Sequence, residues 1–251
     1  MNRSPSPAAK VPEVTLGFWV LKILATTLGE TGGDAFSMSL GWGYLASTAM
    51  FALILGTVAA FQIQATRFHP LLYWGAIVAT TTVGTTLADF ADRSLGIGYA
   101  GGSLLLLGLL LLSLFLWHRT KGSVAVGTVS DPGTESFYWI TILFSQTLGT
   151  ALGDWTADSA GLGYLGGTLI FAGLLGLTAM GLLLPSIPRP LLFWTAFILT
   201  RPLGAVIGDL LDKPHDQGGL ALGRFAASGV LLLALAVGVR VFPQRPAQAA
   251  H

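Results

Sequence analysis

Apolar runs alternate with short polar or glycine-rich breaks along almost the whole chain. A membrane-spanning helix needs about 20 mostly apolar residues, and eight segments approach that length. Four of them are nearly uninterrupted, whereas the four that alternate with them are more polar and end beside an aspartate. This pattern predicts an all-α integral membrane protein with eight transmembrane helices, over residues 16–33, 43–63, 70–88, 97–117, 136–153, 162–184, 190–208 and 219–242.

The eight segments form four copies of one pattern. Each copy begins with an aromatic residue followed by Trp, at Phe18-Trp19, Tyr73-Trp74, Tyr138-Trp139 and Phe193-Trp194. A glycine follows each Trp by ten residues, and an aspartate follows each glycine by five, at Asp34, Asp89, Asp154 and Asp209. Four copies with one spacing indicate tandem repeats. Because each repeat holds two spans, all four start on the same side of the membrane and are parallel repeats.

The spacing between repeats divides the chain into two pseudo-symmetric halves. Successive repeat tryptophans lie 55, 65 and 55 residues apart, and the long middle step contains a polar stretch. We therefore expect a tail (1–14), a first half of two helical hairpins (15–117), a linker (118–135), a second such half (136–242) and a disordered tail (243–251). If the odd-numbered spans line a central axis, the four repeat aspartates face one another.

Composition narrows the class of protein. Only 10% of the residues are charged and 53% are hydrophobic, with a mean hydropathy of +0.71, whereas a soluble domain carries about 25% charged residues. This excludes an ordinary soluble enzyme, a disordered chain and a fibrous protein. The net charge of +1 offers no basic surface for nucleic acid. Cysteine is absent, which excludes disulfides and thiolate metal sites. The expected partners are the lipid bilayer, a small ion or solute and a second copy in a homo-oligomer.

Lysine and arginine mark the side of the membrane that each loop faces. One side would hold Arg3, Lys10, Arg67, Arg119, Lys121, Arg189, Arg240 and Arg245. The other would hold only Arg93 and Lys213, with Arg224 just inside the last span, together with most of the aspartates. Since positive loops stay inside, we expect both termini in the cytoplasm. The first residues lack the pattern of a cleaved signal peptide, so the first span is expected to be retained.

The first repeat resembles a known family. Lys22, Thr26-Thr27-Leu28-Gly29-Glu30 and Asp34 resemble the signature of bacterial membrane-anchored proteins that are built from several copies of a membrane repeat of unknown function. The stretch from Gly208 through Lys213-Pro214 to Leu220 resembles the last repeat of that family. The resemblance covers about residues 12–242. It implies a multi-pass protein of the bacterial inner (cytoplasmic) membrane, and it implies no activity.

Ionisable residues inside the predicted spans are the candidate functional groups. Burying one in the bilayer costs roughly 2.5–3.5 kcal/mol, so such groups are usually paired or functional. Lys22, Glu30 and Asp34 share one face of the first span, and Arg201 is the other deep cation. Oxygen ligands favour Mg²⁺, Ca²⁺ or Mn²⁺. We therefore predict a metal bound by Glu30 and Asp34, with Lys22 and Arg201 balancing the charge. The predicted ion-binding residues are Glu30, Asp34, Asp89, Asp154, Asp209, Thr26, Thr27 and Thr147.

Structural explanations stay open beside this one. The four repeat aspartates would also serve as caps of helices or turns, and a buried Lys–Glu or Arg–Glu pair would also serve to specify helix packing. We expect the repeat glycines to pack helices and the tryptophans to anchor at the membrane interface. We expect four further acids to be loop residues in water, at Asp92, Asp158, Asp212 and Asp216.

The favoured function is a small polytopic transporter or channel. The expected substrate is a divalent cation of the Mn/Mg/Ca type, with proton-coupled export as one mode, and no resident cofactor is expected. The sequence holds no recognisable nucleophile or cofactor motif, so we expect no enzyme, and a membrane enzyme acting on a lipid or quinone ranks last. The alternative is a membrane sensor or assembly partner that transports nothing.

Overall fold

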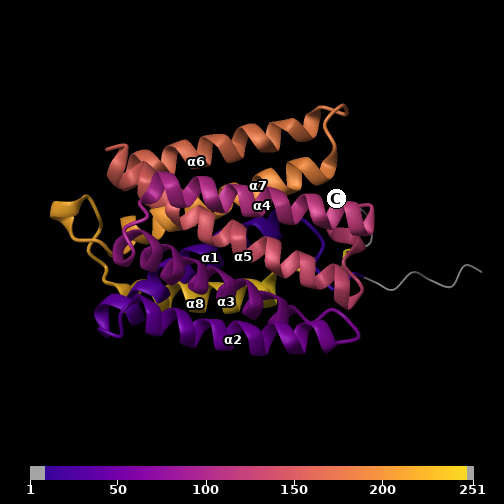
Figure 1. Ribbon diagram of the computed structural model, residues 1–251, viewed down its shortest axis with the longest axis horizontal. Helices are drawn as coiled ribbons and strands as arrows, with labels where there is room; N and C mark the ends of the chain where they lie inside the picture. Colours follow the sequence, from indigo (N-terminus) through magenta and orange to yellow (C-terminus); the bar gives the residue numbers. More distant parts are fainter. Residues whose placement is uncertain (1–8, 248–251) are drawn as a thin grey trace, which may run out of the picture.

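Eight long helices make up most of the protein, whose computed structural model describes residues 9–247 (Figure 1). They are α1 (Leu16–Asp34), α2 (Tyr44–Gln64), α3 (Pro70–Asp89), α4 (Tyr99–Lys121), α5 (Pro132–Asp154), α6 (Gly163–Met180), α7 (Arg189–Asp212) and α8 (Arg224–Val241). Within residues 9–247 there is no β-strand, which confirms the all-α class; a single isolated bridge joins Pro12 and Pro246. Arg3 and the outermost tail residues, 1–8 and 248–251, lie outside the described residues.

The eight helices form two concentric layers. The first helix of every repeat belongs to an inner ring, in which α1 packs against α3, α3 against α5, α5 against α7 and α7 against α1. The second helix of every repeat lies outside this ring. It packs mainly against the inner helix of the next repeat, α2 on α3, α4 on α5, α6 on α7 and, closing the circle, α8 on α1. The two helices of each expected hairpin therefore do not pack mainly against each other, because the outer helix packs on the inner helix of the next repeat.

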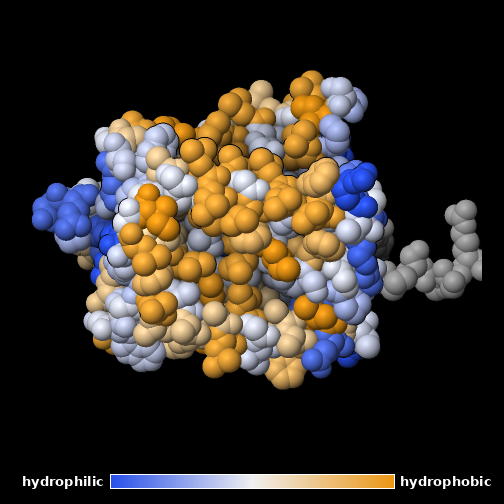
Figure 2. All heavy atoms as spheres, in the orientation of Figure 1, coloured by the Kyte–Doolittle hydropathy of each residue, from blue (hydrophilic) through white to orange (hydrophobic). Residues whose placement is uncertain are grey.

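The outer surface is apolar around its middle. Six helices are long and apolar enough to cross a membrane, namely α2, α3, α4, α6, α7 and α8. The four outer helices of this set are only 11–22% buried over their apolar windows, so their leucine-rich faces point away from the protein. Figure 2 shows a band of hydrophobic residues across the visible face, with hydrophilic residues gathered at the two ends of the bundle. This arrangement is compatible with a multi-pass membrane protein.

We call the two ends of the bundle the terminal end and the turn end. The turn end holds the connections within repeats, and three of these share one form. After its aspartate, each inner helix continues into a π-helical turn, at Ala35–Ser39, Phe90–Ser94 and Trp155–Ser159. A Gly-x-Gly turn then starts the outer helix, and its glycines have positive φ, as at Gly41 (+69°) and Gly43 (+76°). That backbone conformation favours glycine over residues with a Cβ.

The fourth connection differs from the other three. Helix α7 runs three residues beyond its repeat aspartate, to Asp212. Residues 220–222 then return alongside it and donate backbone hydrogen bonds to Leu210, Lys213 and Leu211. Because these residues pair with the end of α7, the last helix starts at Arg224 instead of residue 219, where the apolar run begins.

The terminal end is closed by three chain segments, 9–14, 122–131 and 242–247. The backbone N–H of Lys10 donates to the carbonyl of Val129, and that of Ala247 donates to the carbonyl of Val11. Residues 243–247 are therefore ordered, contrary to the disordered tail expected from residue 243. The linker between the halves shortens to 122–131, because the residues on either side of it extend α4 and begin α5.

Lys10 is a buried cation within this closure. Its Nζ lies 2.8 Å from Glu135 Oε2 and donates to the carbonyls of Ile63 and Ala65. Removing one partner of a buried ion pair leaves a buried charge uncompensated, at a cost of about 3–5 kcal/mol. We expect Lys10→Met to lower the melting temperature of the purified protein markedly.

A matched control lies close by. Lys121 and Asp131 form an ion pair at the same distance of 2.8 Å, but their side chains are 34% and 49% exposed. Exposed pairs contribute about 0–1 kcal/mol, so Lys121→Met should melt almost as the wild type does. Equal losses in the two variants would show that burial does not set the contribution of Lys10.

Candidate functional site

Five layers of buried side chains succeed one another through the inner ring. Each layer takes one residue from each inner helix, and successive layers are four residues, or about 6 Å, apart. The layer beside the terminal end consists of Phe18, Tyr73, Tyr138 and Phe193, and the next of Lys22, Ile77, Ile142 and Phe197. The third layer consists of Thr26, Thr81, Gln146 and Arg201, and the fourth of Glu30, Thr85, Thr150 and Ala205. The four repeat aspartates form the fifth, so polarity rises toward the turn end.

Close packing of the inner helices holds these layers in register. A Cβ added to Gly29 would lie 1.9 Å from Thr81 Oγ1, and one added to Gly204 would lie 2.3 Å from Thr26 Oγ1. Each repeat glycine thus receives a third-layer side chain of the next inner helix, around the whole ring. The expected packing role of these glycines fits this arrangement, which brings the helix backbones close together.

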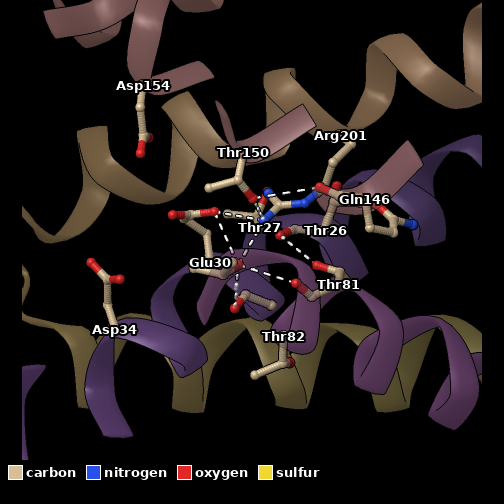
Figure 3. A network of polar contacts seen from close by, with 12 residues as sticks. Thr26, Thr27, Glu30, Asp34, Thr81, Thr82, Gln146, Thr150, Asp154 and Arg201 are labelled. Carbon is tan, nitrogen blue, oxygen red and sulfur yellow. Dashed lines mark hydrogen bonds and ion pairs between the residues drawn. The ribbon is translucent and has the colours of Figure 1, made fainter. Parts of the chain in front are cut away.

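Arg201 crosses the centre of the ring. Its Nη2 donates to Glu30 Oε2 on α1 at 2.8 Å and contacts Thr150 Oγ1 on α5 (Figure 3). It also donates to Thr85 Oγ1 on α3 at 2.6 Å. A side chain from α7 therefore binds all three other inner helices. The fourth-layer position of α7 itself is Ala205, whose small side chain leaves room for the guanidinium.

Three carboxylates converge on the turn-end side of Arg201. One oxygen each of Glu30, Asp154 and Asp209 lie within 4.8 Å of one another, and all three residues are buried. We call this group the carboxylate triad. Its members come from three different inner helices, α1, α5 and α7, so the group exists only when the ring is assembled. Hard oxygen ligands at this spacing suit a small divalent cation.

Two cations bridge the repeat aspartates in pairs. Arg93 Nε lies 2.8 Å from Asp89 in its own repeat, and its Nη2 lies 3.6 Å from Asp154 in the next. Lys213 Nζ lies 3.0 Å from Asp209 in its own repeat and 3.4 Å from Asp34 in the first. Each cation follows its own aspartate by four residues. The two bridged pairs give the fifth layer an approximate twofold symmetry, although four similar repeats supply its aspartates.

A third cation lies at the turn end. Arg224 Nε is 2.9 Å from Asp212 and 3.4 Å from Asp34. Burial by itself lowers the pKa of Lys213, but the nearby carboxylates, Asp209 first, raise it by more, so this pKa lies above its ordinary value and the ammonium stays charged. A cavity of about 420 Å³ opens beside these groups and is lined by Arg93, Asp212, Lys213 and Arg224 among others.

The charges of this network of ion pairs do not cancel. Six carboxylates lie in or against the network, at Glu30, Asp34, Asp89, Asp154, Asp209 and Asp212. Four cations contact them, at Arg93, Arg201, Lys213 and Arg224. With every group ionised, six against four leaves an excess of two negative charges. An uncompensated charge in a buried setting is unfavourable, so this excess favours uptake of a cation or of protons.

The structure groups the predicted site residues differently from the sequence. Glu30 pairs with Arg201 and not with Lys22, whose ammonium lies over the ring of Phe197, 4.1 Å from its centroid. Asp34 is not in the carboxylate triad, because Lys213 and Arg224 hold its Oδ2. The structure therefore groups Glu30 with Asp154 and Asp209, and not with Asp34, as carboxylates close enough to share a metal ion.

Three predicted hydroxyls donate to backbone carbonyls. Thr26, Thr27 and Thr147 donate to carbonyls three or four residues earlier in their own helices, and Thr26 also to Thr200 of α7. The hydroxyls at Arg201 are those of Thr85 and Thr150. Thr85 was not among the predicted residues, although it follows its Trp by 11 residues, as Glu30 does, and this shared position in the repeat identifies it.

The repeat aspartates do not act as the helix caps that the alternative interpretation predicted. In residues 9–247 the carboxylates of Asp34, Asp89 and Asp154 cap no following helix, and all four repeat aspartates are buried. Asp212, expected in water, is also buried and binds Arg224. Asp158 and Asp216 are exposed as expected.

The tryptophans also differ from the expected interface anchors. Trp74, Trp139 and Trp194 are buried at the terminal end, where they pack with the first-layer aromatic residues. Trp74 Nε1 donates to Gln244 Oε1, and Trp194 Nε1 donates to the carbonyl of Val124. These three repeat tryptophans therefore close the ring at this end, whereas Trp19 is half-buried.

Comparison with known proteins finds the same four units. The model of a family described as Repeat of Unknown Function (DUF347) matches the chain over residues 17–68, 72–123, 137–186 and 192–245. Each match covers most of one inner helix and the outer helix that follows it. No curated protein and no solved structure matches the chain.

Proposed function

We propose, from the premise that this chain belongs to the family of the Repeat of Unknown Function (DUF347), that it is a multi-pass membrane protein that binds and translocates a cation. The cation site is the carboxylate triad. The observation that carries the proposal is the convergence of Glu30, Asp154 and Asp209 from three helices, with their oxygens within 4.8 Å of one another. A cavity at the turn end is lined by Arg93 and Lys213, which pair with Asp154 and Asp209 of the triad.

All eight helices span the membrane in this proposal. Helices α1 and α5 are more polar than the six helices that are apolar enough to cross a membrane. Both are inner helices that pack against several neighbours. Polar side chains are tolerated in a span that faces the interior of a bundle. The terminal end lies in the cytoplasm of a bacterial inner membrane, as the excess of Lys and Arg in its loops favours. The turn end then faces outward.

The charge of the site favours a divalent cation exchanged for protons. Two excess negative charges are neutralised by one divalent cation or by two protons. The cation-bound and the doubly protonated states of the site therefore carry the same net charge. Carboxylate ligands without sulfur or imidazole suit Mn²⁺, Mg²⁺ or Ca²⁺. The aromatic first layer and the closed terminal end support an occluded state that is reached from the turn end.

Mn²⁺ provides the test. We expect purified protein in liposomes to admit Mn²⁺, measured as quenching of an entrapped Fura-2 dye, and Asp154→Asn to reduce this flux by about tenfold, because the affinity of such sites depends on the number of carboxylate charges. The matched control is Asp158→Asn, one turn further along the same repeat and exposed. It should behave as the wild type.

Other outcomes separate the alternatives. Wild-type protein that binds Mn²⁺ without flux would favour a sensor or assembly partner over a transporter. Equal flux in the two variants would overturn the carboxylate triad as the site.

A further inference from the structure

Arg201 lies where a translocated cation would have to pass. Its guanidinium contacts all three other inner helices, so it separates the carboxylate triad from the layers nearer the terminal end. It also binds Oε2 of Glu30, a member of the triad. A fixed positive charge at this place repels any cation and competes with it for Glu30.

The surroundings of Arg201 offer it a second partner. Among the described residues, Arg201 Nε and Nη1 have no hydrogen-bond partner, and neither do Gln146 Oε1 and Nε2. Both side chains are fully buried and belong to the third layer. The stem of Arg201 already lies against α5, because its Cγ would be 2.2 Å from a Cβ on Gly149, one turn from Gln146. Buried polar atoms nearly always have a hydrogen-bond partner, so the unpaired side-chain atoms of Arg201 and Gln146 need an explanation.

The backbone beside Arg201 has a built-in weak point. Pro202 lies inside α7 and has no N–H to donate to the carbonyl four residues earlier. Interior prolines are common sites of helix kinks. Bending at this residue would turn the Arg201 side chain along the ring without breaking the hydrogen bonds of the other inner helices.

We propose that Arg201 is a tethered counter-ion that exchanges with the bound cation. With the site empty it binds Glu30, Thr85 and Thr150. When a divalent cation takes Glu30, the guanidinium turns toward the terminal end and binds the amide oxygen of Gln146. The exchange keeps Glu30 paired in both states and prevents an open pore. This inference rests on the proposed cation site, and it adds how that site is kept closed.

The test measures Mn²⁺ affinity in lipid nanodiscs by electron paramagnetic resonance. Arg201→Gln removes the competitor, and we expect its Kd for Mn²⁺ to be about tenfold lower than that of the wild type. Gln146→Met keeps the resting Glu30–Arg201 pair and removes only the second partner, so we expect a Kd about tenfold higher. Thr147→Val, next to Gln146 but bonded only to its own helix, is the control and should match the wild type.

The outcomes distinguish the two proposals. Wild-type protein that binds no Mn²⁺ overturns the cation site and the counter-ion with it. Binding in the wild type, with no tightening in Arg201→Gln or no weakening in Gln146→Met, overturns the counter-ion alone. Because Gln146→Met retains the buried ion pair, it remains informative if Arg201→Gln does not fold.

Discussion

Glu30→Gln is expected to be among the least stable single variants of this protein. The substitution leaves Arg201, which is fully buried, without its only carboxylate at 2.8 Å. Breaking a buried pair by removing one partner costs about 3–5 kcal/mol. Arginine cannot escape this cost by losing its proton, because it stays charged in proteins. The loss should appear as a large fall in melting temperature, or as failure to purify a monodisperse protein.

The reverse substitution is expected to be milder. Arg201→Gln leaves Glu30 unpaired, but a carboxylate can be neutralised by taking up a proton, and Thr85 still lies 3.3 Å from it. The double variant Glu30→Gln with Arg201→Gln removes both charges and should recover most of the stability lost in Glu30→Gln. A double variant as unstable as Glu30→Gln would show that the pair is not the cause.

Gly204→Ala is expected to disrupt the ring of inner helices. The added Cβ would lie 2.3 Å from Thr26 Oγ1, 2.6 Å from its Cβ and 2.9 Å from its backbone carbon. Since the backbone of α1 is among the clashing atoms, a side-chain rotation cannot relieve the contact, and α1 and α7 must separate. Overpacking of this kind costs about 1–3 kcal/mol and occasionally more. Its effect should be seen as a lower melting temperature.

Gly173→Ala is the matched control. Gly173 lies within α6, and a Cβ there would meet nothing within 4 Å. In an open helix position alanine is favoured over glycine by about 1 kcal/mol, so this variant should be as stable as the wild type or slightly more so. Similar losses in both variants would mean that close approach of α1 and α7 does not explain Gly204.

Much of the fold follows from local patterns in the sequence. The apolar runs placed every helix end within five residues, with the largest difference at the start of α8, and the Trp–Gly–Asp spacing put the four aspartates into one buried layer. These features depend on periodicity along one chain segment, which a sequence displays directly. The packing partners of the outer helices could not be predicted in this way, because a short turn lets a helix pack either on the inner helix of its own repeat or on that of the next.

The pairing of charges depended on the order of helices around the ring. Lys22 and Arg201 were both deep cations, and nothing local decides between them as the partner of Glu30. Arg201 binds Glu30 because α7 neighbours α1, whereas Lys22 lies two layers nearer the terminal end, over Phe197. The sequence could have predicted one ion pair each for Arg93 and Lys213, since both follow a repeat aspartate by four residues. Their second partners could not be predicted, because these again come from the next helix.

Closure of the ring also bears on how the protein is made. The Glu30–Arg201 contact joins residues 171 positions apart, and Lys213 meets Asp34 across 179 positions. When α1 is synthesised, the cations that pair with its two acids do not yet exist, because Arg201, Lys213 and Arg224 all belong to the last repeat. The ring can therefore close around these acids only after the last repeat has been made. Truncation anywhere before α7 leaves both acids without these partners.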